Sequence, residues 1–320
     1  MKEIIITEND ANQRADKFLT KTFKSLPVSL MYKAFRKKDI KLNKKRCHPE
    51  YKLQNGDVLN IYIKDEFLQP AKNQYDFMKA PIKLDIIYED QNIMLVNKKP
   101  GLLCHPDETY HFDLLIARVQ HYLFDKKEFN PKNENSFSPS LVNRIDRNTG
   151  GIGIVAKNAN SLRILNSKLK NREIKKFYLC IVNGKLKKKQ DTLVDYLEKN
   201  ESKNKVFISK TPSKNSKIIK TKYEVISENE NFSLLNIELL TGRTHQIRAH
   251  LAFIGHSLLG DGKYGINKIN RETHYKYQAL YSYKLKFNFS SSGNQLEYLN
   301  GKTFTAPKVW FVDDFYNNLK

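Results

Sequence analysis

Two neighbouring segments in which apolar and polar residues alternate, KTKYEVISE (220–228) and FSLLNIELL (232–240), most constrain the fold of this chain. This alternation predicts two strands of an antiparallel sheet with one buried and one solvent-exposed face. Further strands are predicted at 84–90, 93–98, 152–156 and 175–184. Because strands dominate without a regular strand–helix–strand rhythm, the pattern favours an α+β fold over a doubly wound one.

The first 64 residues have a pattern of their own and are predicted to form a small separate domain. A strand at 2–7 precedes two helices, at 14–23 and 28–39, each with an apolar stripe on one face, and a last strand follows at 58–63. Asn12 or Asp10 is the expected cap of the first helix. Residues 65–80 lack periodicity and are predicted to link this domain, 1–64, to a second domain at 81–320.

The second domain is expected to contain helices at 112–123, 159–170 and 243–255. Asn158 or Asn160 would cap the second of these helices, and Thr244 would cap the third, which would stop at Gly255. Two polar segments, 125–140 and 197–220, would either tune the choice of target or be only surface insertions, and the second interpretation is favoured. The first is expected to be a mobile loop and the second a low-complexity loop around one short strand.

The formal net charge of +22 at pH 7 would attract polyanions and speed their association. Nucleic acid, held through its phosphates, is therefore the favoured partner, although a lysine- and asparagine-rich composition could produce part of this charge without any function. Basic residues are dense on and just after the second predicted helix. We predict a phosphate-binding face there, with Arg36, Lys37, Lys38, Lys45 and Arg46 among its members.

The cysteine pattern indicates the compartment. Cys47, Cys104 and Cys180 are far apart and form no CxxC pair, which favours a reducing cytoplasm over disulfides or a structural zinc site. The first residues lack the apolar region of a signal peptide, and no apolar run approaches the roughly 20 residues of a membrane helix. We therefore expect a soluble cytoplasmic protein that does not bind a membrane.

The segment LVNRIDRNTGGIGIVAKN (141–158) places Asp146 between Arg144 and Arg147 in a glycine-rich turn. A carboxylate beside cations stays ionised well below neutral pH, so Asp146 could serve as a nucleophile or base without a metal. Residues two apart share one face of a strand, which would put Arg144 and Asp146 on one side. The glycines permit close approach of another backbone but match no nucleotide-binding loop. The residues alone favour a simpler explanation, a turn aspartate paired with arginine.

Two other segments carry groups that could take part in chemistry. In TGRTHQIRAH (241–250), Arg248 lies one helical turn after Thr244 and could point back to an anion site at the helix start. His245 and His250 lack the i, i+4 spacing of a zinc pair, so no metal site is expected. In KKFYLCIVNG (175–184), Tyr178 could be a core residue or could stack on a nucleobase.

Together these segments resemble the RluA-type pseudouridine synthase family. NRIDRNTGG is similar to its motif HRLDxxTSG, KKFYLCIVNG to KxYxAxxxG, and TGRTHQIRAHLAFIGHSLLGDGKYG to the long and specific TGRxHQIRxHxxxxGxPxxGDxxYG. YEDQNIMLVNKKPGLLCHP resembles the family's opening YEDxxxxxxxKPxGxxxHP, with Lys99, Pro100 and His105 in place. Order and spacing agree from residue 81 to about 310, and residues 1–64 resemble the small RNA-binding module of ribosomal protein S-four.

The resemblance implies a pseudouridine synthase fold, with a mixed, mainly antiparallel central sheet, and the isomerisation of uridine in RNA without a cofactor. Asp146 would either add to carbon 6 of uracil or assist cleavage at carbon 1′ of the ribose, and both routes stay open. Arg248 would pair with Asp146, Tyr178 would stack on the detached base, and the glycines after Asp146 would leave room for a flipped uridine. The other expected substrate contacts are Arg144, Thr149, Lys176, Arg243, His245 and Gln246.

Some residues depart from the family pattern and affect substrate choice more than chemistry. They are Asn143 for His, Ile145 for Leu, Gly150–Gly151 for Ser–Gly, and Tyr281 for His. Large-subunit ribosomal RNA is the expected substrate, tRNA is the alternative, and we expect a monomer. The competing functions are a non-catalytic ribosome-associated RNA-binding factor and a metal-dependent RNA hydrolase. The hydrolase is disfavoured because no carboxylate or histidine cluster has metal-ligand spacing.

Overall fold

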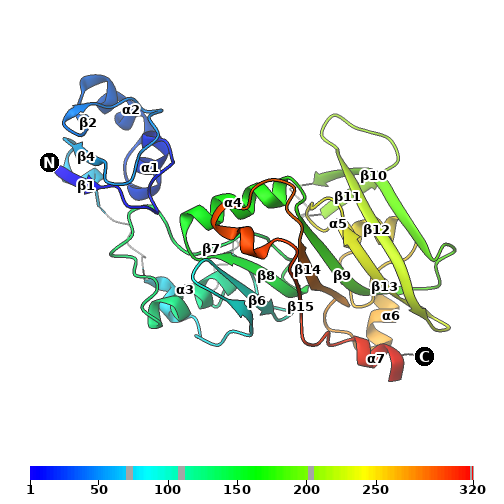
Figure 1. Cartoon of the computed structure of the whole chain (residues 1–320). Coiled ribbons are helices and arrows are strands. Elements are labelled where there is room, and N and C mark those ends of the chain that lie inside the picture. Colours follow the sequence, from blue (N-terminus) through cyan, green and yellow to red (C-terminus); the bar gives the residue numbers. More distant parts are fainter. Residues whose placement is uncertain (70–74, 107–111, 201–204, 318, 320) are drawn as a thin grey trace.

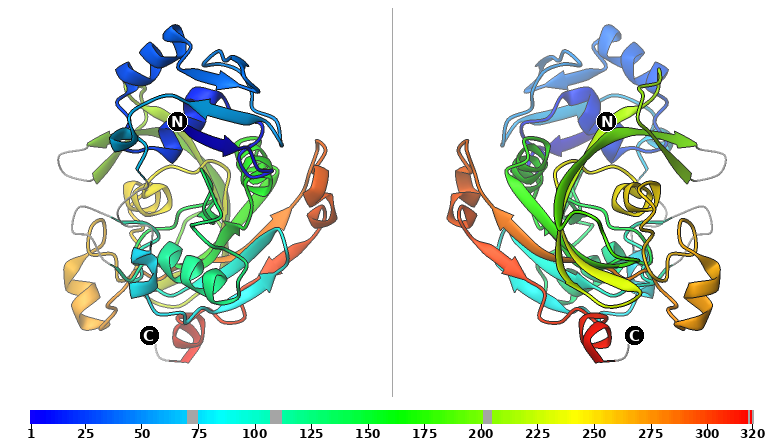
Figure 2. Two further views of the ribbon diagram at one scale, coloured as in Figure 1. Left: turned by 90° about the vertical axis from the view of Figure 1, so that its left-hand side faces the viewer. Right: turned by 90° about the vertical axis from the view of Figure 1, so that its right-hand side faces the viewer.

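The computed structural model describes residues 1–69, 75–106, 112–200, 205–317 and 319. Figure 1 shows a small N-terminal unit beside a larger body built on one long sheet. In Figure 2 the sheet is strongly curved, and helix α5 (Gln246–Phe253) lies on its concave side. Within the described ranges, no helix is both long and apolar enough to cross a membrane.

The N-terminal unit is a four-stranded antiparallel sheet, in the order β1-β4-β2-β3, with two helices. Its elements are β1 (Lys2–Ile5), α1 (Ala15–Thr22), α2 (Val28–Lys37), β2 (Ile40–Leu42), β3 (Lys45–Arg46) and β4 (Val58–Ile61). The predicted apolar stripes are confirmed as the buried helix faces, since Phe18 of α1 and Phe35 of α2 are at most 2% exposed. The predicted cap of α1 is wrong, because the helix starts after Arg14 without a side-chain cap.

The body contains an 11-stranded sheet whose main path is β11-β10-β12-β13-β9-β14-β8-β6-β5. Neighbours along this path are antiparallel except β14 and β8, which confirms the α+β class and the mixed, mainly antiparallel sheet. The strands are β5 (Ile86–Glu89), β6 (Ile93–Lys98), β7 (Ser140–Leu141), β8 (Gly150–Ala156), β9 (Ile174–Asn183), β10 (Gln190–Asn200), β11 (Lys205–Ser209), β12 (Lys217–Glu228), β13 (Phe232–Leu239), β14 (Leu280–Phe287) and β15 (Thr303–Thr305).

Strands β12 and β13 pair in antiparallel fashion, as their alternation predicts. The prediction for 197–220 is confirmed for its one short strand, which is β11, and wrong for the rest of the expected loop, because β10 runs to Asn200 and β12 already starts at Lys217. The alternation here is short and interrupted by lysines, yet Leu197, Val206 and Ile219 pack together against α5. The apolar face of α5 therefore stabilises strands that propensity alone would not predict.

Helices cover both faces of the sheet. The helices of the body are α3 (Leu115–Asp125), α4 (Ala159–Lys170), α5, α6 (Asn267–Glu272) and α7 (Val312–Asn317), and short 3₁₀ turns occur at Asp65–Phe67, Asp76–Lys79 and Asn294–Leu299. Strand β6 is buried on both sides, with Leu95 packed on the side of α4 and Val96 on the side of α3. This explains why its sequence is a continuous apolar run rather than an alternating one.

Helix ends were predicted with mixed success. Asn158 caps α4, since its Oδ1 accepts from Ser161 N–H at 2.8 Å. The expected cap of α5 at Thr244 is wrong: His245 takes the N-cap position in a left-handed conformation with φ 52°, and the helix begins at Gln246. Gly255, with φ 88°, follows the end of this helix as expected.

The described parts of the expected linker pack with the units on either side. Leu68 belongs to the core of the N-terminal unit and Phe77 to the core of the body, while residues 70–74 lie outside the described residues. The division at 64 and 81 stays a proposal. Segment 125–140 was expected to be a mobile loop, but its residues 134–136 hydrogen-bond to the N-terminal unit.

Candidate active site

Asp146 lies in a turn that is tied to a buried scaffold. Thr149 N–H donates to Asp146 O at 3.1 Å, which closes the turn. Before it, Asn143 Oδ1 accepts from Ile154 N–H at 2.7 Å and fixes the segment to β8. Ile145 is buried, whereas 27% of the Asp146 side chain is exposed. The segment is not a strand, but Arg144 and Asp146 are both more exposed than the residues between and before them.

Lys98, at the end of β6, holds the far side of the turn. The residue is 1% exposed, and its ammonium group donates to the carbonyls of Arg147 (2.9 Å), Leu102 (2.8 Å) and Lys99 (3.1 Å). Burial lowers the pKa of Lys98 to about 8, although the charges of Cys104 and Asp146 act in the other direction. Gly101 N–H also donates to Arg147 O at 2.9 Å. Two loops distant in sequence are thus joined directly behind Asp146.

The glycines after Asp146 serve the packing of β8 rather than substrate entry. A Cβ on Gly150 would lie 2.3 Å from the Tyr281 ring, and one on Gly151, which has φ 117°, would lie 2.2 Å from Ser282 O. These two glycines let β8 run parallel to β14 at close range. The prediction that the glycines permit close approach of another backbone is therefore confirmed. The prediction that these two glycines leave room for a flipped uridine is wrong, because Tyr281 and Ser282 fill the space beside them.

Arg248 of α5 is the partner of Asp146, as predicted. Its Nη1 donates to Asp146 Oδ2 at 2.9 Å, while Nε and Nη2 donate to both oxygens of Asp261 at 2.7 and 2.8 Å. The guanidinium also lies 5.3 Å from the centroid of the Tyr264 ring. Among the described residues, neither flanking arginine forms an ion pair with Asp146, and Arg147 instead donates to Gly101 O at 3.3 Å.

Asp146, Arg248 and Asp261 form a triad in which the carboxylate of Asp261 balances the charge of the guanidinium. Burial alone would lower the pKa of Arg248, but its bonds to Asp261 and the charges of Asp261 and Asp146 raise it. Burial alone would raise the pKa of Asp261, which is fully buried, but Arg248 and the backbone N–H groups of Lys263 and Tyr264 lower it. Asp261 therefore neutralises the guanidinium, and the triad keeps one net negative charge on the exposed side, at Asp146.

His245 borders the same carboxylate. Its Nε2 lies 3.9 Å from Asp146 Oδ2, and its Nδ1 lies 3.0 Å from the Tyr264 hydroxyl. Burial lowers the pKa of His245, against the raising effect of Asp146, so the ring is neutral near pH 7. The Tyr264 hydroxyl also accepts from Val206 N–H at 3.0 Å, and the imidazole tautomer decides whether the hydroxyl or Nδ1 donates in the bond between them.

Tyr178 comes from β9 and is part of the main core of the body, with 5% of its surface exposed. Burial raises the pKa of its hydroxyl to about 12, and the nearby negative charge of Asp146 acts in the same direction. The ring is therefore a neutral phenol close to Asp146. Stacking on a base would use the small exposed part of this ring or require neighbouring side chains to move.

The other predicted substrate contacts fall into two groups. Arg144 and Arg243 are exposed, and Lys176 is half-buried with its pKa lowered by burial. Thr149 and Gln246 are buried, and both form hydrogen bonds inside the protein. Thr149 Oγ1 accepts from Gln278 at 2.7 Å, and the Gln246 amide donates to Lys220 O and Thr221 Oγ1. A direct contact of these two with RNA is not supported by their positions, and both are better explained as structural residues.

In the N-terminal unit the predicted basic face is exposed throughout. Arg36 and Lys37 end α2, Lys38 follows in a left-handed conformation, and Lys45 and Arg46 form β3. Strand β3 pairs with β2, and β2 packs beside α2, so the two groups of cations belong to adjacent elements (Figure 1).

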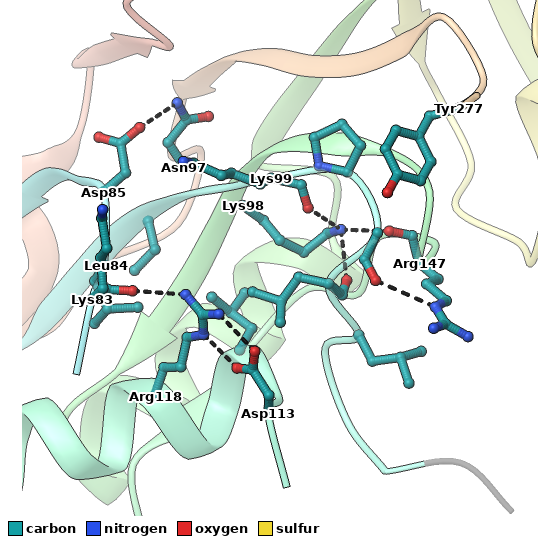
Figure 3. Close-up of a pocket in the computed structure, with 16 residues that line it drawn as sticks. Lys83, Leu84, Asp85, Asn97, Lys98, Lys99, Asp113, Arg118, Arg147 and Tyr277 are labelled. Atoms are coloured by element: carbon teal, nitrogen blue, oxygen red, sulfur yellow. Dashed lines mark hydrogen bonds and ion pairs between the residues drawn. The ribbon is translucent and has the colours of Figure 1, made fainter. Parts of the chain in front are cut away.

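A pocket of about 590 Å³ lies behind the turn, but Asp146, Arg248 and Tyr178 do not line it. Figure 3 shows that Lys98, Arg147 and Tyr277 lie on one side of this pocket, with Arg118 and Asp113 on another. Arg118 donates two hydrogen bonds to Asp113, and Lys98 donates to three backbone carbonyls. These charged groups of the pocket lining therefore already have partners inside the protein. Across the described ranges, no group of three or more His, Cys, Asp or Glu is placed to hold a metal ion.

Three residues of the site were missed by sequence reasoning: Asp261, Tyr264 and Lys98. Asp261 and Tyr264 lie inside the GDGKYG stretch, and a buried arginine nearby needs a carboxylate, so the second acid could have been sought there. Lys98 ends a strand whose other residues are mostly apolar, and a lysine in such a place needs several acceptors.

Sequence comparisons match this chain to RNA pseudouridylate synthases. The family model described as RNA pseudouridylate synthase matches residues 92–253, which include Asp146, Tyr178 and Arg248. An uncharacterized RNA pseudouridine synthase of Mycoplasma capricolum subsp. capricolum is 34% identical over 97% of this chain and 99% of its own length. The ribosomal large subunit pseudouridine synthase C of Vibrio parahaemolyticus is 32% identical over 84% of this chain and 81% of its own.

Solved structures support the fold. The human RNA pseudouridylate synthase domain containing 4 superposes with a TM-score of 0.56 at 18% identity, covering 72% of this chain and 92% of its own. The human RNA pseudouridylate synthase domain containing 1 superposes with a TM-score of 0.53 at 21% identity, covering 74% of this chain and 96% of its own. By its matched segment and its relatives over nearly the whole length, this chain belongs to the RNA pseudouridylate synthase family, isomerases that convert uridine in RNA to pseudouridine.

Proposed function

We propose that this chain modifies specific uridines of large-subunit ribosomal RNA and that Asp146 is the catalytic residue. The observation that carries the proposal is the carboxylate of Asp146, partly exposed and held by an arginine whose charge a buried second carboxylate already balances. Large-subunit RNA is favoured because relatives across most of the chain carry that substrate in their names.

The reaction suits a site without a cofactor. The bond between N1 of uracil and C1′ of ribose breaks, a bond between C5 and C1′ forms, N1 gains a proton and C5 loses one. Atoms and electrons balance, so no oxidant or reductant is needed. Asp146 would act as a nucleophile, at C6 or at C1′, or as the base that removes the C5 proton.

The neighbours of Asp146 would orient it and hold the detached base. Arg248 is a positioning residue, since all three of its nitrogens are engaged with carboxylates. His245, whose pKa is lowered by burial, places Nε2 near Asp146, and Tyr178 supplies an apolar ring beside Asp146. The exposed Arg144 and Arg243 and the half-buried Lys176 would contact the RNA backbone.

The N-terminal unit would add affinity that is largely independent of sequence, through Arg36, Lys37, Lys38, Lys45 and Arg46. We propose that it is an S-four-type RNA-binding module and that the protein acts as a cytoplasmic monomer. A target uridine inside a helix must leave it to reach Asp146, and phosphate contacts would offset the few kcal/mol that this costs.

The test is to map pseudouridines in ribosomal RNA and tRNA of cells that lack the protein and of cells that express it or the isosteric Asp146→Asn variant. Sites should disappear without the protein, return with the wild type and stay absent with the variant. Restoration by Asp146→Asn would reject the role of Asp146. Loss of sites in tRNA alone would replace the proposed substrate, and no lost site at all would favour the non-catalytic RNA-binding factor.

A further inference from the structure

A polar interface joins the N-terminal unit to the body independently of the linker. The loop between β1 and α1 (residues 7–13) meets residues 134–136 and the beginning of α4. Figure 1 shows the N-terminal unit adjacent to this end of α4. We call this set of contacts the latch: residues 7–13 on one side, and residues 134–136, Ala159 and Arg163 on the other.

Asp10 is the centre of the latch and is fully buried. Its Oδ2 accepts from Asn135 Nδ2 at 2.7 Å and from Thr7 Oγ1 at 2.9 Å, and its Oδ1 accepts from the Ser136 hydroxyl at 2.7 Å. Ser136 Oγ in turn accepts from Gln13 Nε2 at 2.8 Å. Two of the three side-chain donors to this carboxylate therefore come from the other unit.

Two further contacts reach α4. Asn9 bridges the units, because its Nδ2 donates to Glu134 Oε1 at 2.9 Å and its Oδ1 accepts from Ala159 N–H at 3.0 Å. That amide belongs to the first turn of α4 and has no acceptor inside its own helix. Arg163, one turn later, donates to Ala11 O at 3.1 Å. The N-terminal unit is thus held at the 134–136 segment and at two points of one helix.

These contacts specify an orientation more than they supply adhesion. A buried carboxylate that loses its donors is strongly penalised, and each donor here satisfies it only at one relative placement of the two units. Hydrogen bonds of this kind have little tolerance for sliding, unlike an apolar interface. The expected default for two domains joined by a short linker is relative motion, and the latch opposes it.

We propose that the latch determines which uridine is modified, by fixing the distance and direction between the basic face of the N-terminal unit and Asp146. This inference rests on the proposed function. A unit on a free tether would raise the local concentration of RNA near Asp146 and favour any uridine within reach. A fixed unit selects a uridine at a set position relative to the RNA element that the basic face binds.

The experiment compares the double variant Asn135→Ala/Ser136→Ala with wild type and with the control Asn133→Ala. Asn133 is an exposed asparagine of the same segment, and its side chain is not among the latch contacts. Each protein is assayed on a short hairpin that carries the target uridine alone and on a long ribosomal RNA fragment, with pseudouridine mapping. Small-angle scattering of the free proteins reports the arrangement of the two units.

The double variant should keep kcat and KM on the hairpin, raise KM on the long fragment by about tenfold or more, and modify additional uridines. Its scattering curve should indicate a broader distribution of shapes, while the control matches wild type. Unchanged scattering, an unchanged uridine pattern or an equal rise of KM on both RNAs would each overturn the proposal. If wild type modified neither RNA, the proposed function would fail instead, and scattering would still decide whether the latch fixes the orientation.

Discussion

Replacing Asp261 by Asn tests whether this second carboxylate is needed to hold Asp146, the proposed catalytic residue. Asp261 is fully buried and accepts two guanidinium bonds and two backbone N–H bonds. The amide would remove the charge and turn an N–H group toward an Arg248 N–H group. Removing one partner of a buried ion pair costs about 3–5 kcal/mol, and we expect the lower end because Asn retains one acceptor oxygen.

For a body of this size, a loss of about 3 kcal/mol corresponds to a decrease in Tm of about 6–12 °C. Arg248, left without its anchor, should also lose its fixed position at Asp146, and kcat should fall about 100-fold, which is roughly 2.7 kcal/mol in the activation barrier. Thermal unfolding and single-turnover assays on a hairpin RNA measure the two effects. Asp191, which is partly exposed and pairs with the exposed Lys188, serves as the control when replaced by Asn and should change neither quantity appreciably.

The pH dependence of this stability difference gives a further check. The pKa of Asp261 is lowered in the folded state, so its contribution is fully present above the ordinary value of 3.8 and is lost as the pH falls through the lower folded value. The difference between wild type and variant should be constant near pH 7 and shrink only below about pH 4. A variant that kept both its Tm and its kcat would refute the view that Asp261 positions Arg248.

Three other predictions concern Lys98, Gly150 and the basic face of the N-terminal unit. Lys98→Met should loosen the loops behind Asp146 and lower kcat. Because the pKa of Lys98 is lowered to about 8 in the folded state, the stability of wild type should rise relative to this variant between pH 8 and 10.5, and urea unfolding at several pH values measures this. Gly150→Ala should destabilise the body by about 1–3 kcal/mol, because its Cβ overlaps the Tyr281 ring, and an unchanged urea midpoint would contradict this packing. Neutralising Arg36, Lys37, Lys45 and Arg46 together should lower the slope of log affinity against log salt by about 3 for single-stranded RNA, and an unchanged slope in a binding titration would exclude this face from RNA contact.

Local patterns predicted the elements wherever one face of the element is apolar. The stripes of α1 and α2 and the alternation of β12 and β13 required no knowledge of distant residues. The one short strand expected within 197–220 is β11, but the extensions of β10 and β12 into this segment were missed, because the burial of Leu197 and Ile219 depends on α5, which follows later in the sequence. The predicted cap of α1 is wrong because the helix starts only after Arg14, and Asp10 instead serves the latch, a contact with residues more than 120 positions away. Tertiary contacts decided both cases, and one-dimensional patterns do not contain them.

The sequence likewise predicted some contacts within the site correctly and others incorrectly. Asp146 and Arg248 are 102 residues apart, and no periodicity relates them, so only the family resemblance brought them together. Thr149 and Gln246 were expected to contact RNA because they lie in those motifs, but their polar groups face buried partners. A motif therefore indicates that a position matters without separating a residue that touches substrate from one that shapes the loop.

Cations near Asp146 have separate tasks. Arg248 donates one N–H each from Nε, Nη1 and Nη2 to two carboxylates and packs against Tyr264, which fixes its guanidinium inside the protein. Lys98 is likewise satisfied by three carbonyls, which matches its three N–H donors. Because these two buried cations only orient the turn and its carboxylate, the attraction of RNA must come from exposed side chains such as Arg144 and Arg243. Salt can then weaken RNA binding through the exposed cations while the buried triad, screened much less, keeps Asp146 in place.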